Sequence, residues 1–210
     1  MTEKNFSLET INALSAIDPS FEGLIERKIS ASPEIFLKHL YKDIDEAIVN
    51  LEQQRHMYQG KMWGEDQLTF QIITFLKGRL YDAEHDTQHG GHVDILVKQQ
   101  HGRFEWIGEA KLWDGPSYIQ DGWIQLTERY STGTINDNAG GLIIYIKQQK
   151  ALDKFQNWRS HFESNNECIS LAFDQENPLR FESKTAHPTS GLPYSVRHMA
   201  VCLYHHTGDN

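Results

Sequence analysis

The first part of the chain has apolar residues at helical spacing. One stripe consists of Phe36, Leu37, Leu40, Ile44, Ile48 and Leu51. A second stripe consists of Leu68, Ile72, Phe75 and Leu76. We therefore expect residues 5 to 60 to be mostly helical and another helix to run from Glu65 to about Leu80. The organisation that follows is an N-terminal helical extension, residues 1 to 60, before a domain of residues 61 to 210.

The pattern then changes to one that is typical of strands. Residues 91 to 98 and 104 to 113 predict a hairpin, and the run LIIYI at 142 to 146 resembles a buried central strand. Four further segments are expected, namely helices at 118 to 130 and 150 to 163 and strands at 168 to 174 and 195 to 204. The sequence thus predicts an α/β fold in which helices flank a mixed central β-sheet.

Charged residues interrupt the apolar hairpin. Asp94 lies in its first strand, and Glu109 and Lys111 lie in its second. Because side chains alternate along a strand, Glu109 and Lys111 share a face, and Asp94 on the neighbouring strand, about 4.8 Å away, comes within reach of the same cation. Two converging carboxylates repel each other and take up a proton unless something neutralises them. The alternative is an exposed hairpin face with an ordinary Glu–Lys pair.

A divalent cation would resolve this repulsion. Mg²⁺ prefers a few carboxylates together with waters and phosphate oxygens, and it activates water and stabilises charge on a phosphate. A neighbouring lysine can orient or deprotonate the water, or stabilise the developing negative charge. Glu65 lies on the apolar stripe of its helix, where an acid needs a partner such as a metal site. The alternative for Glu65 is a first-turn acid that the helix dipole favours.

Composition narrows the classes of protein. The chain has 39% hydrophobic and 23% charged residues, which is typical of a soluble globular protein, and no apolar run approaches the length of a membrane span. The start, MTEKNFSLET, lacks the basic and apolar regions of a signal peptide, and two cysteines are too few for a disulfide scaffold. We therefore expect a cytoplasmic protein. The formal net charge of −9 argues against a surface that grips phosphate all over, although a local basic groove is compatible with it.

The order of these features resembles that of the PD-(D/E)xK nuclease superfamily, which has the restriction-endonuclease-like fold. The resemblance runs from Glu65 in GEDQLTF to about Ile146 and includes Asp94 in HVDILV and Glu109 and Lys111 in GEAKLW. The proline of the nominal motif is absent, because valine precedes Asp94.

The resemblance implies a phosphodiesterase that depends on Mg²⁺ or Mn²⁺ and acts on DNA, in restriction, phage defence or DNA repair. Asp94 and Glu109 would be metal ligands, and Ala110 would offer its backbone carbonyl to the metal. Lys111 would be the catalytic lysine, and Glu65 an accessory acid. The implied partner is nucleic acid rather than a membrane, with a homodimer or a subunit of a larger complex as the assembly.

The helix after the hairpin carries candidate nucleic-acid contacts. Some branches of the superfamily have a Gln and a Tyr four residues apart here, whereas Gln125 and Tyr130 are five apart. Tyr118, Gly122, Gln125 and Arg129 form a ridge beside the buried stripe. We expect Gly122 to allow close approach of a nucleic-acid backbone, which Gln125 and Arg129 would then contact. The alternative is a simple polar helix edge.

Two other functions remain open. The stretch HDTQHGGHVD holds His85, His89 and His92, whose spacing suggests zinc and hence a zinc-binding interaction module, although no cysteine lies nearby. The other alternative keeps the fold as a catalytically inactive nucleic-acid-binding or scaffolding subunit. A modest basic region follows the apolar strand and consists of Lys147, Lys150, Lys154 and Arg159. A solvated helix face is the favoured interpretation of this region.

Overall fold

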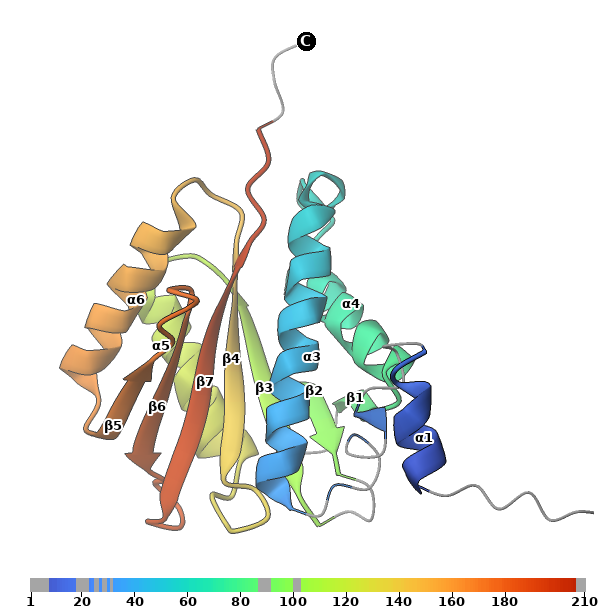
Figure 1. The fold of residues 1–210 in the computed structure, drawn as a ribbon. Helices are drawn as coiled ribbons and strands as arrows, with labels where there is room; N and C mark the ends of the chain where they lie inside the picture. The colour runs from blue at the N-terminus through green and yellow to red at the C-terminus, as the bar shows by residue number, and fades with distance from the viewer. Residues whose placement is uncertain are drawn as a thin grey trace, which may run out of the picture.

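The structure is a computed structural model that describes residues 8–17, 23, 24, 27, 30, 32–86, 92–99 and 103–206. The described residues form an α/β fold with a seven-stranded mixed sheet that has helices on both faces (Figure 1). The strands are β1 (Asp82–Asp86), β2 (Val93–Lys98), β3 (Glu105–Leu112), β4 (Ala139–Ile146), β5 (Cys168–Phe173), β6 (Arg180–Ala186) and β7 (Pro193–Cys202). The helices are α1 (Leu8–Leu14), α3 (Pro33–Gln53), η2 (Arg55–Tyr58), α4 (Glu65–Gly78), α5 (Pro116–Ile124), η3 (Gln125–Tyr130) and α6 (Ala151–Asn165). No helix in these ranges is long and apolar enough to span a membrane.

The sheet has the strand order β1-β2-β3-β4-β7-β6-β5. Strands β3, β4 and β7 are parallel to one another, and the outer pairs are antiparallel. The predicted hairpin is present as β2 and β3, with Ile95 paired to Gly108 and Leu96 to Ile107. The expected α/β class with a mixed sheet and flanking helices is therefore confirmed.

Two apolar layers separate the helices from the sheet. On one face, α3 and α4 pack against side chains such as Trp106, Ala110 and Tyr145. On the other face, α5, η3 and α6 pack against a second cluster that includes Ile107 and Ile144 (Figure 1). Alternation along β3 therefore directs the odd-numbered residues from 107 to 111 toward α5 and the even-numbered ones toward α4.

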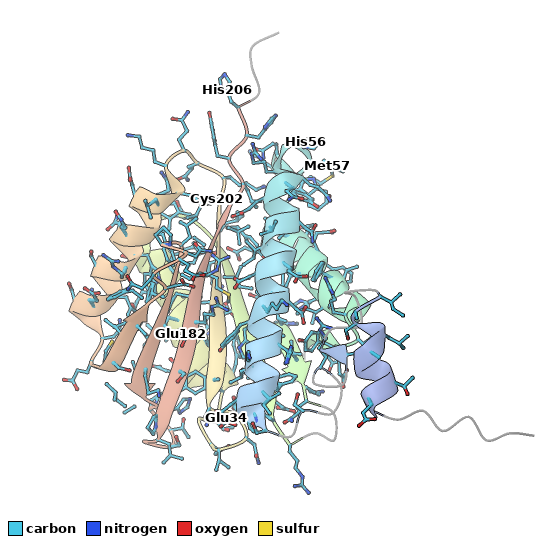
Figure 2. All side chains as sticks on the ribbon, in the orientation of Figure 1. Glu34, His56, Met57, Glu182, Cys202 and His206 are labelled. Carbon is cyan, nitrogen blue, oxygen red and sulfur yellow. The ribbon has the colours of Figure 1, made fainter. Side chains whose placement is uncertain are left out.

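Helix α3 is built into the main core. Ser32 caps its start by accepting a hydrogen bond from the Ile35 amide, and a proline occupies the first turn. The fully buried side chains of Phe36, Leu40 and Ile44 belong to the same cluster as those of α4 and the sheet. Figure 2 shows side chains filling the space between α3 and the sheet. The expected N-terminal helical extension therefore shares one core with the α/β domain.

A buried ionic group adds to the attachment of α3. Asp43, which is 0% exposed, accepts hydrogen bonds from Arg27 at 2.7 and 3.0 Å and from the Tyr81 hydroxyl at 2.6 Å. These contacts join α3 to the chain on both sides of it, since Arg27 precedes α3 and Tyr81 follows α4. A buried carboxylate with this many donors is satisfied, so the network has a structural role.

Candidate active site

Strands β2 and β3 bring two carboxylates to adjacent positions. One step beyond the Ile95–Gly108 pair, the same register places Asp94 opposite Glu109. Asp94 is half-buried, and its Oδ2 accepts a hydrogen bond from the Ala110 amide at 2.8 Å. Glu109 is only 2% exposed because it lies in a central strand beneath α5. The expected convergence of these two acids is therefore present in the geometry.

Lys111 completes a compact charged group. Its Nζ donates a hydrogen bond to Glu109 Oε1 at 2.6 Å and lies 5.9 Å from the centre of the Tyr118 ring. Lys111 is 9% exposed, so this is not an ordinary surface Glu–Lys pair. The second oxygen of Glu109, Oε2, is buried and has no hydrogen-bond partner among the described residues. A buried carboxylate oxygen without a donor is unusual and indicates a place for a positively charged ligand or a proton.

Glu65 reaches this group from the other face of the sheet. It is the first residue of α4, and its Oε1 accepts hydrogen bonds from the Leu112 amide at 2.8 Å and the Tyr118 hydroxyl at 3.0 Å. Glu65 thus joins the start of α4, the end of β3 and the start of α5. It is a first-turn acid and also faces the charged group, so the two interpretations of its position are compatible. The sequence placed Tyr118 only on the ridge of the helix after the hairpin, whereas in the structure its hydroxyl contacts Glu65 of this group.

The charges of the group do not balance. Three carboxylates, those of Glu65, Asp94 and Glu109, act on one ammonium, that of Lys111. Burial and the charge of Asp94 raise the pKa of Glu109 to about 8, although Lys111 acts in the opposite direction. Burial also raises the pKa of Asp94, with the Ala110 amide and Lys111 opposing it.

The lysine has the complementary perturbation. Burial alone would lower the pKa of Lys111, but Glu109, Glu65 and Asp94 together outweigh it and raise that pKa above its ordinary value. Lys111 is therefore an ammonium at neutral pH. An ammonium in this place donates hydrogen bonds and stabilises negative charge, whereas it cannot take a proton from water.

The donor set fits an open cation site. Among the residues that the structure describes, no three His, Cys, Asp or Glu side chains converge on one point as a closed metal cage would require. Mg²⁺ is usually held by one or two carboxylates, with waters and substrate phosphates as its other ligands. Asp94 and Glu109, with the unpartnered Oε2 between sheet and helix, match that chemistry. The expected role of the Ala110 carbonyl as a ligand stays a prediction.

The helix after β3 differs from the expected nucleic-acid ridge. Gly122 is buried against Lys111, so the expectation that it admits a nucleic-acid backbone is wrong. The Oε1 of Gln125 is also buried, without a hydrogen-bond partner in the described part of the chain, while Arg129 is exposed. Nucleic-acid contact by Gln125 and Arg129 stays a prediction, and the geometry favours Arg129 as the surface group.

The described histidines near β2 have different surroundings. His85 is in β1, and its Nδ1 lies 2.8 Å from the Val93 carbonyl oxygen. His92 is exposed just before β2, and His89 lies outside the described residues. A zinc site on these three side chains therefore stays a prediction.

The basic region after β4 has internal contacts. Lys147 Nζ donates hydrogen bonds to the carbonyls of Gly60 and Trp63, and Lys154 Nζ donates to the Gln149 carbonyl. Lys147 therefore fastens the connection that leads into α4 and Glu65.

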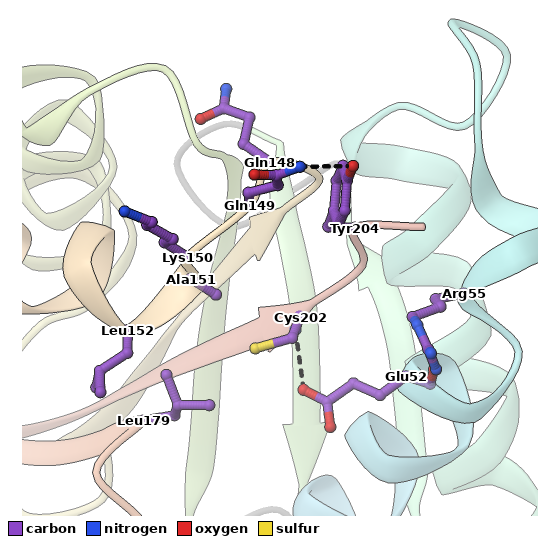
Figure 3. A pocket seen from close by; sticks show the side chains of 10 residues that line it. All are labelled: Glu52, Arg55, Gln148, Gln149, Lys150, Ala151, Leu152, Leu179, Cys202 and Tyr204. Atoms are coloured by element: carbon purple, nitrogen blue, oxygen red, sulfur yellow. Dashed lines mark hydrogen bonds between the residues drawn. The ribbon is translucent and has the colours of Figure 1, made fainter. Parts of the chain in front are cut away.

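A pocket of about 560 Å³ lies near the end of β7 (Figure 3). In it, Glu52 accepts a hydrogen bond from the Cys202 amide at 2.9 Å, and Gln149 donates to the Tyr204 hydroxyl at 2.8 Å. None of the four predicted catalytic side chains lines this pocket. The pocket and the charged group are thus separate features of the molecule.

Comparisons with known proteins give no relatives. No protein-family model matches the chain, no curated protein matches it, and no solved structure matches its fold.

Proposed function

We propose that the protein is a metal-dependent nuclease of the PD-(D/E)xK type, which hydrolyses phosphodiester bonds in DNA with Mg²⁺ or Mn²⁺. One observation carries the proposal: buried Glu109 converges with half-buried Asp94 and only Lys111 offsets their charge, so the pKa of Glu109 rises to about 8, and Glu109 Oε2 has no partner in the described chain. A divalent cation supplies the missing charge, and a lysine beside such a cation is suited to phosphate chemistry. The restriction-endonuclease-like fold is part of the same proposal.

Asp94 and Glu109 would hold the cation, and Glu65 would act as the accessory acid. When bound, the cation would activate water and offset charge on the phosphate. Hydrolysis joins the water oxygen to phosphorus, breaks the bond from phosphorus to a sugar oxygen, and transfers one proton of the water to that departing oxygen. Lys111, which remains an ammonium, donates hydrogen bonds to the phosphate oxygens as their charge grows. Tyr118 and Glu65 keep the end of β3 and the start of α5 together around this group.

The direct test incubates the purified protein with linear, circular and single-stranded DNA and with RNA. Each substrate is offered with Mg²⁺ or Mn²⁺, with and without EDTA. We expect cleavage of DNA that requires the divalent cation and stops with EDTA. The DNA form that is cut distinguishes an endonuclease from an exonuclease.

The variant Lys111→Ala separates catalysis from binding. Loss of a positioned electrostatic group slows an enzyme by roughly 10²–10³-fold, so we expect cleavage at least about a hundredfold slower and DNA affinity within a few-fold of wild type. Lys184→Ala, which removes an exposed lysine of β6, is the matched control and should leave both unchanged. A Lys111→Ala variant that cuts as fast as wild type would refute the catalytic assignment.

A second candidate function is a catalytically inactive nucleic-acid-binding or scaffolding subunit. The formal net charge of −9 favours it, because an acidic surface slows association with a phosphate polymer. The surplus of acids in the site opposes it, since a site without chemistry has no physical need of them. DNA binding without cleavage under any cation would establish this alternative.

A further inference from the structure

Helix α5 contains a glycine where helix stability would favour another residue. Gly122 lies within Pro116–Ile124 and is buried against β3 and β4. Glycine is the least favourable residue in a helix interior apart from proline, because its backbone loses the most freedom on folding. Gly122 does not have the positive φ that would require glycine on conformational grounds. The reason for a glycine is therefore to be found in its surroundings.

The surroundings of Gly122 are dominated by Lys111. A Cβ added at Gly122 would lie 2.9 Å from Lys111 Cγ and 3.1 Å from Lys111 Cε, both closer than ordinary contacts between carbon atoms. The same Cβ would lie 3.4 Å from Leu142 Cδ1, which is an ordinary packing distance. Among the described residues, an alanine at this position would thus collide with the lysine alone.

The lysine stem has little freedom to move aside. Its root is fixed in β3, where Lys111 is paired with Ile144 of β4. Its tip is fixed by the 2.6 Å hydrogen bond from Nζ to Glu109. A stem that is held at both ends can avoid a new methyl group only by breaking the contact at the tip or by displacing α5.

We propose that Gly122 is a positioning residue, whose missing side chain forms the slot that directs the stem of Lys111 and so places its ammonium beside Glu109. As a statement about structure, this inference stands on the contacts alone. As a statement about rate, it rests on the proposed nuclease function. The two statements are tested by different measurements.

The structural test is a set of thermal unfolding midpoints without divalent cation. Gly122→Ala should lower Tm in the wild-type background. In the Lys111→Ala background the slot is empty and alanine is the better helix former, so the same change should raise Tm by about 2–4 °C. In the Lys111→Met background, which keeps an unbranched stem but loses the contact of its tip to Glu109, Gly122→Ala should raise Tm less than it does in the Lys111→Ala background.

A matched control is available in α4. Gly78 also lies in a helix, and a Cβ added there would meet nothing within 4 Å. Gly78→Ala should therefore have the same small effect on Tm with Lys111 present or absent. Gly122→Ala could instead lower Tm equally in the wild-type and Lys111→Ala backgrounds. In that case close packing of the α5 backbone on the sheet, and not Lys111, would be the reason for glycine at this position, and the inference would be overturned.

The catalytic test is the rate of DNA cleavage with saturating Mg²⁺ or Mn²⁺. Gly122→Ala should lower kcat at least about tenfold with KM within a few-fold, because the displaced ammonium acts on the transition state rather than on binding. In the Lys111→Ala background it should cause no further loss. Two results would contradict the positioning role. One is a Gly122→Ala enzyme that cuts as fast as wild type. The other is a loss of kcat on Gly122→Ala that is as large in the Lys111→Ala background as in the wild-type background. If the wild type cuts nothing, the nuclease proposal fails, while the Tm measurements still decide what Gly122 does.

Discussion

Asp94→Asn should change stability in opposite directions with and without a divalent cation. In the wild-type protein, Asp94 Oδ2 accepts a hydrogen bond from the Ala110 amide at 2.8 Å. Asparagine has nearly the same size and keeps one side-chain oxygen that can accept this bond. The substitution removes one of the negative charges that face Glu109 and raise its pKa. The metal-free protein should therefore lose a repulsion and keep its local hydrogen bond.

The size of this gain follows from the register. Directly opposed residues of an antiparallel pair have Cβ atoms about 5 Å apart. Above pH 8, where Glu109 is ionised as well as Asp94, two unit charges at about that separation repel by roughly 3 kcal/mol at an effective dielectric constant of 20. Asp94 is only half-buried and is attracted by Lys111, both of which reduce the net effect. We expect the variant without cation to be more stable by about 1 kcal/mol, or a Tm higher by about 2–4 °C.

A divalent cation should reverse the order. Wild-type protein at a cation concentration ten times the Kd gains about 1.4 kcal/mol, whereas a variant that has lost a ligand gains little. When Tm is plotted against Mn²⁺ concentration, starting from EDTA, the curves of wild type and Asp94→Asn should therefore cross. Glu163→Gln, which removes an exposed acid of α6, is the control and should follow the wild-type curve.

Two results would refute this reasoning. An Asp94→Asn variant that is less stable than wild type in EDTA would show that Asp94 has a structural role. A variant that gains as much from Mn²⁺ as wild type does would show that the acid pair does not hold the cation. Either result would remove the main support for the proposed metal site.

Two further predictions concern pH and salt. Burial lowers the pKa of His198 from 6.5 to about 3, so the stability that neutral His198 contributes is fully present above pH 6.5 and is lost as the pH falls toward 3. The loss amounts to about 2 kcal/mol by pH 5. Chemical denaturation of His198→Asn should therefore show a free energy of unfolding that changes less between pH 7 and 5 than that of wild type. DNA binding should weaken only about 10- to 40-fold between roughly 50 and 200 mM salt, because few phosphates are contacted; a slope that implies eight or more contacts would point to an oligomer or a different surface.

The elements that the sequence predicted best are those with regular apolar spacing. The predicted helix from Glu65 is present as α4, and β2, β3 and β4 lie within a few residues of their expected bounds. Apart from Thr69, Glu109 and Lys111, their buried side chains are apolar, so the apolar pattern and the burial agree. The same alternation predicted that Asp94, Glu109 and Lys111 would share a face, because a strand leaves only two choices.

Two strands had no such pattern. Strand β1 is an edge strand with the sequence DAEHD, in which Ala83 is the buried residue and its neighbours are charged or polar. In β6, the buried positions after Phe181 are occupied by Ser183 and Thr185. The Ser183 hydroxyl forms a hydrogen bond with His198 of β7, and only the tertiary fold brings these two residues together. Hydrophobic periodicity cannot indicate a strand whose inward side chains are polar.

Roles on the helix after β3 could not be predicted for a related reason. The spacing of Tyr118, Gly122 and Gln125 defines a ridge but does not say which way the ridge points. In the structure, Gly122 faces Lys111 across the layer between helix and sheet, and Tyr118 faces Glu65. The contacts of Lys147 are equally remote in sequence, since they join it to residues more than eighty positions earlier. Each of these roles depends on a partner from another element.

The position of the acid group in the fold argues for its use. A buried ion pair contributes little to stability, and apolar side chains of similar volume are often at least as stabilising. Neighbouring inward positions on β3 and β4 are held by Ile107 and Ile144, so the same face accepts apolar residues. Glu109 alone would satisfy Lys111, yet Asp94 and Glu65 add negative charge beside it and raise the pKa of Glu109. A group that opposes folding in this way is typical of a functional site, because chemistry requires the charges that packing does not.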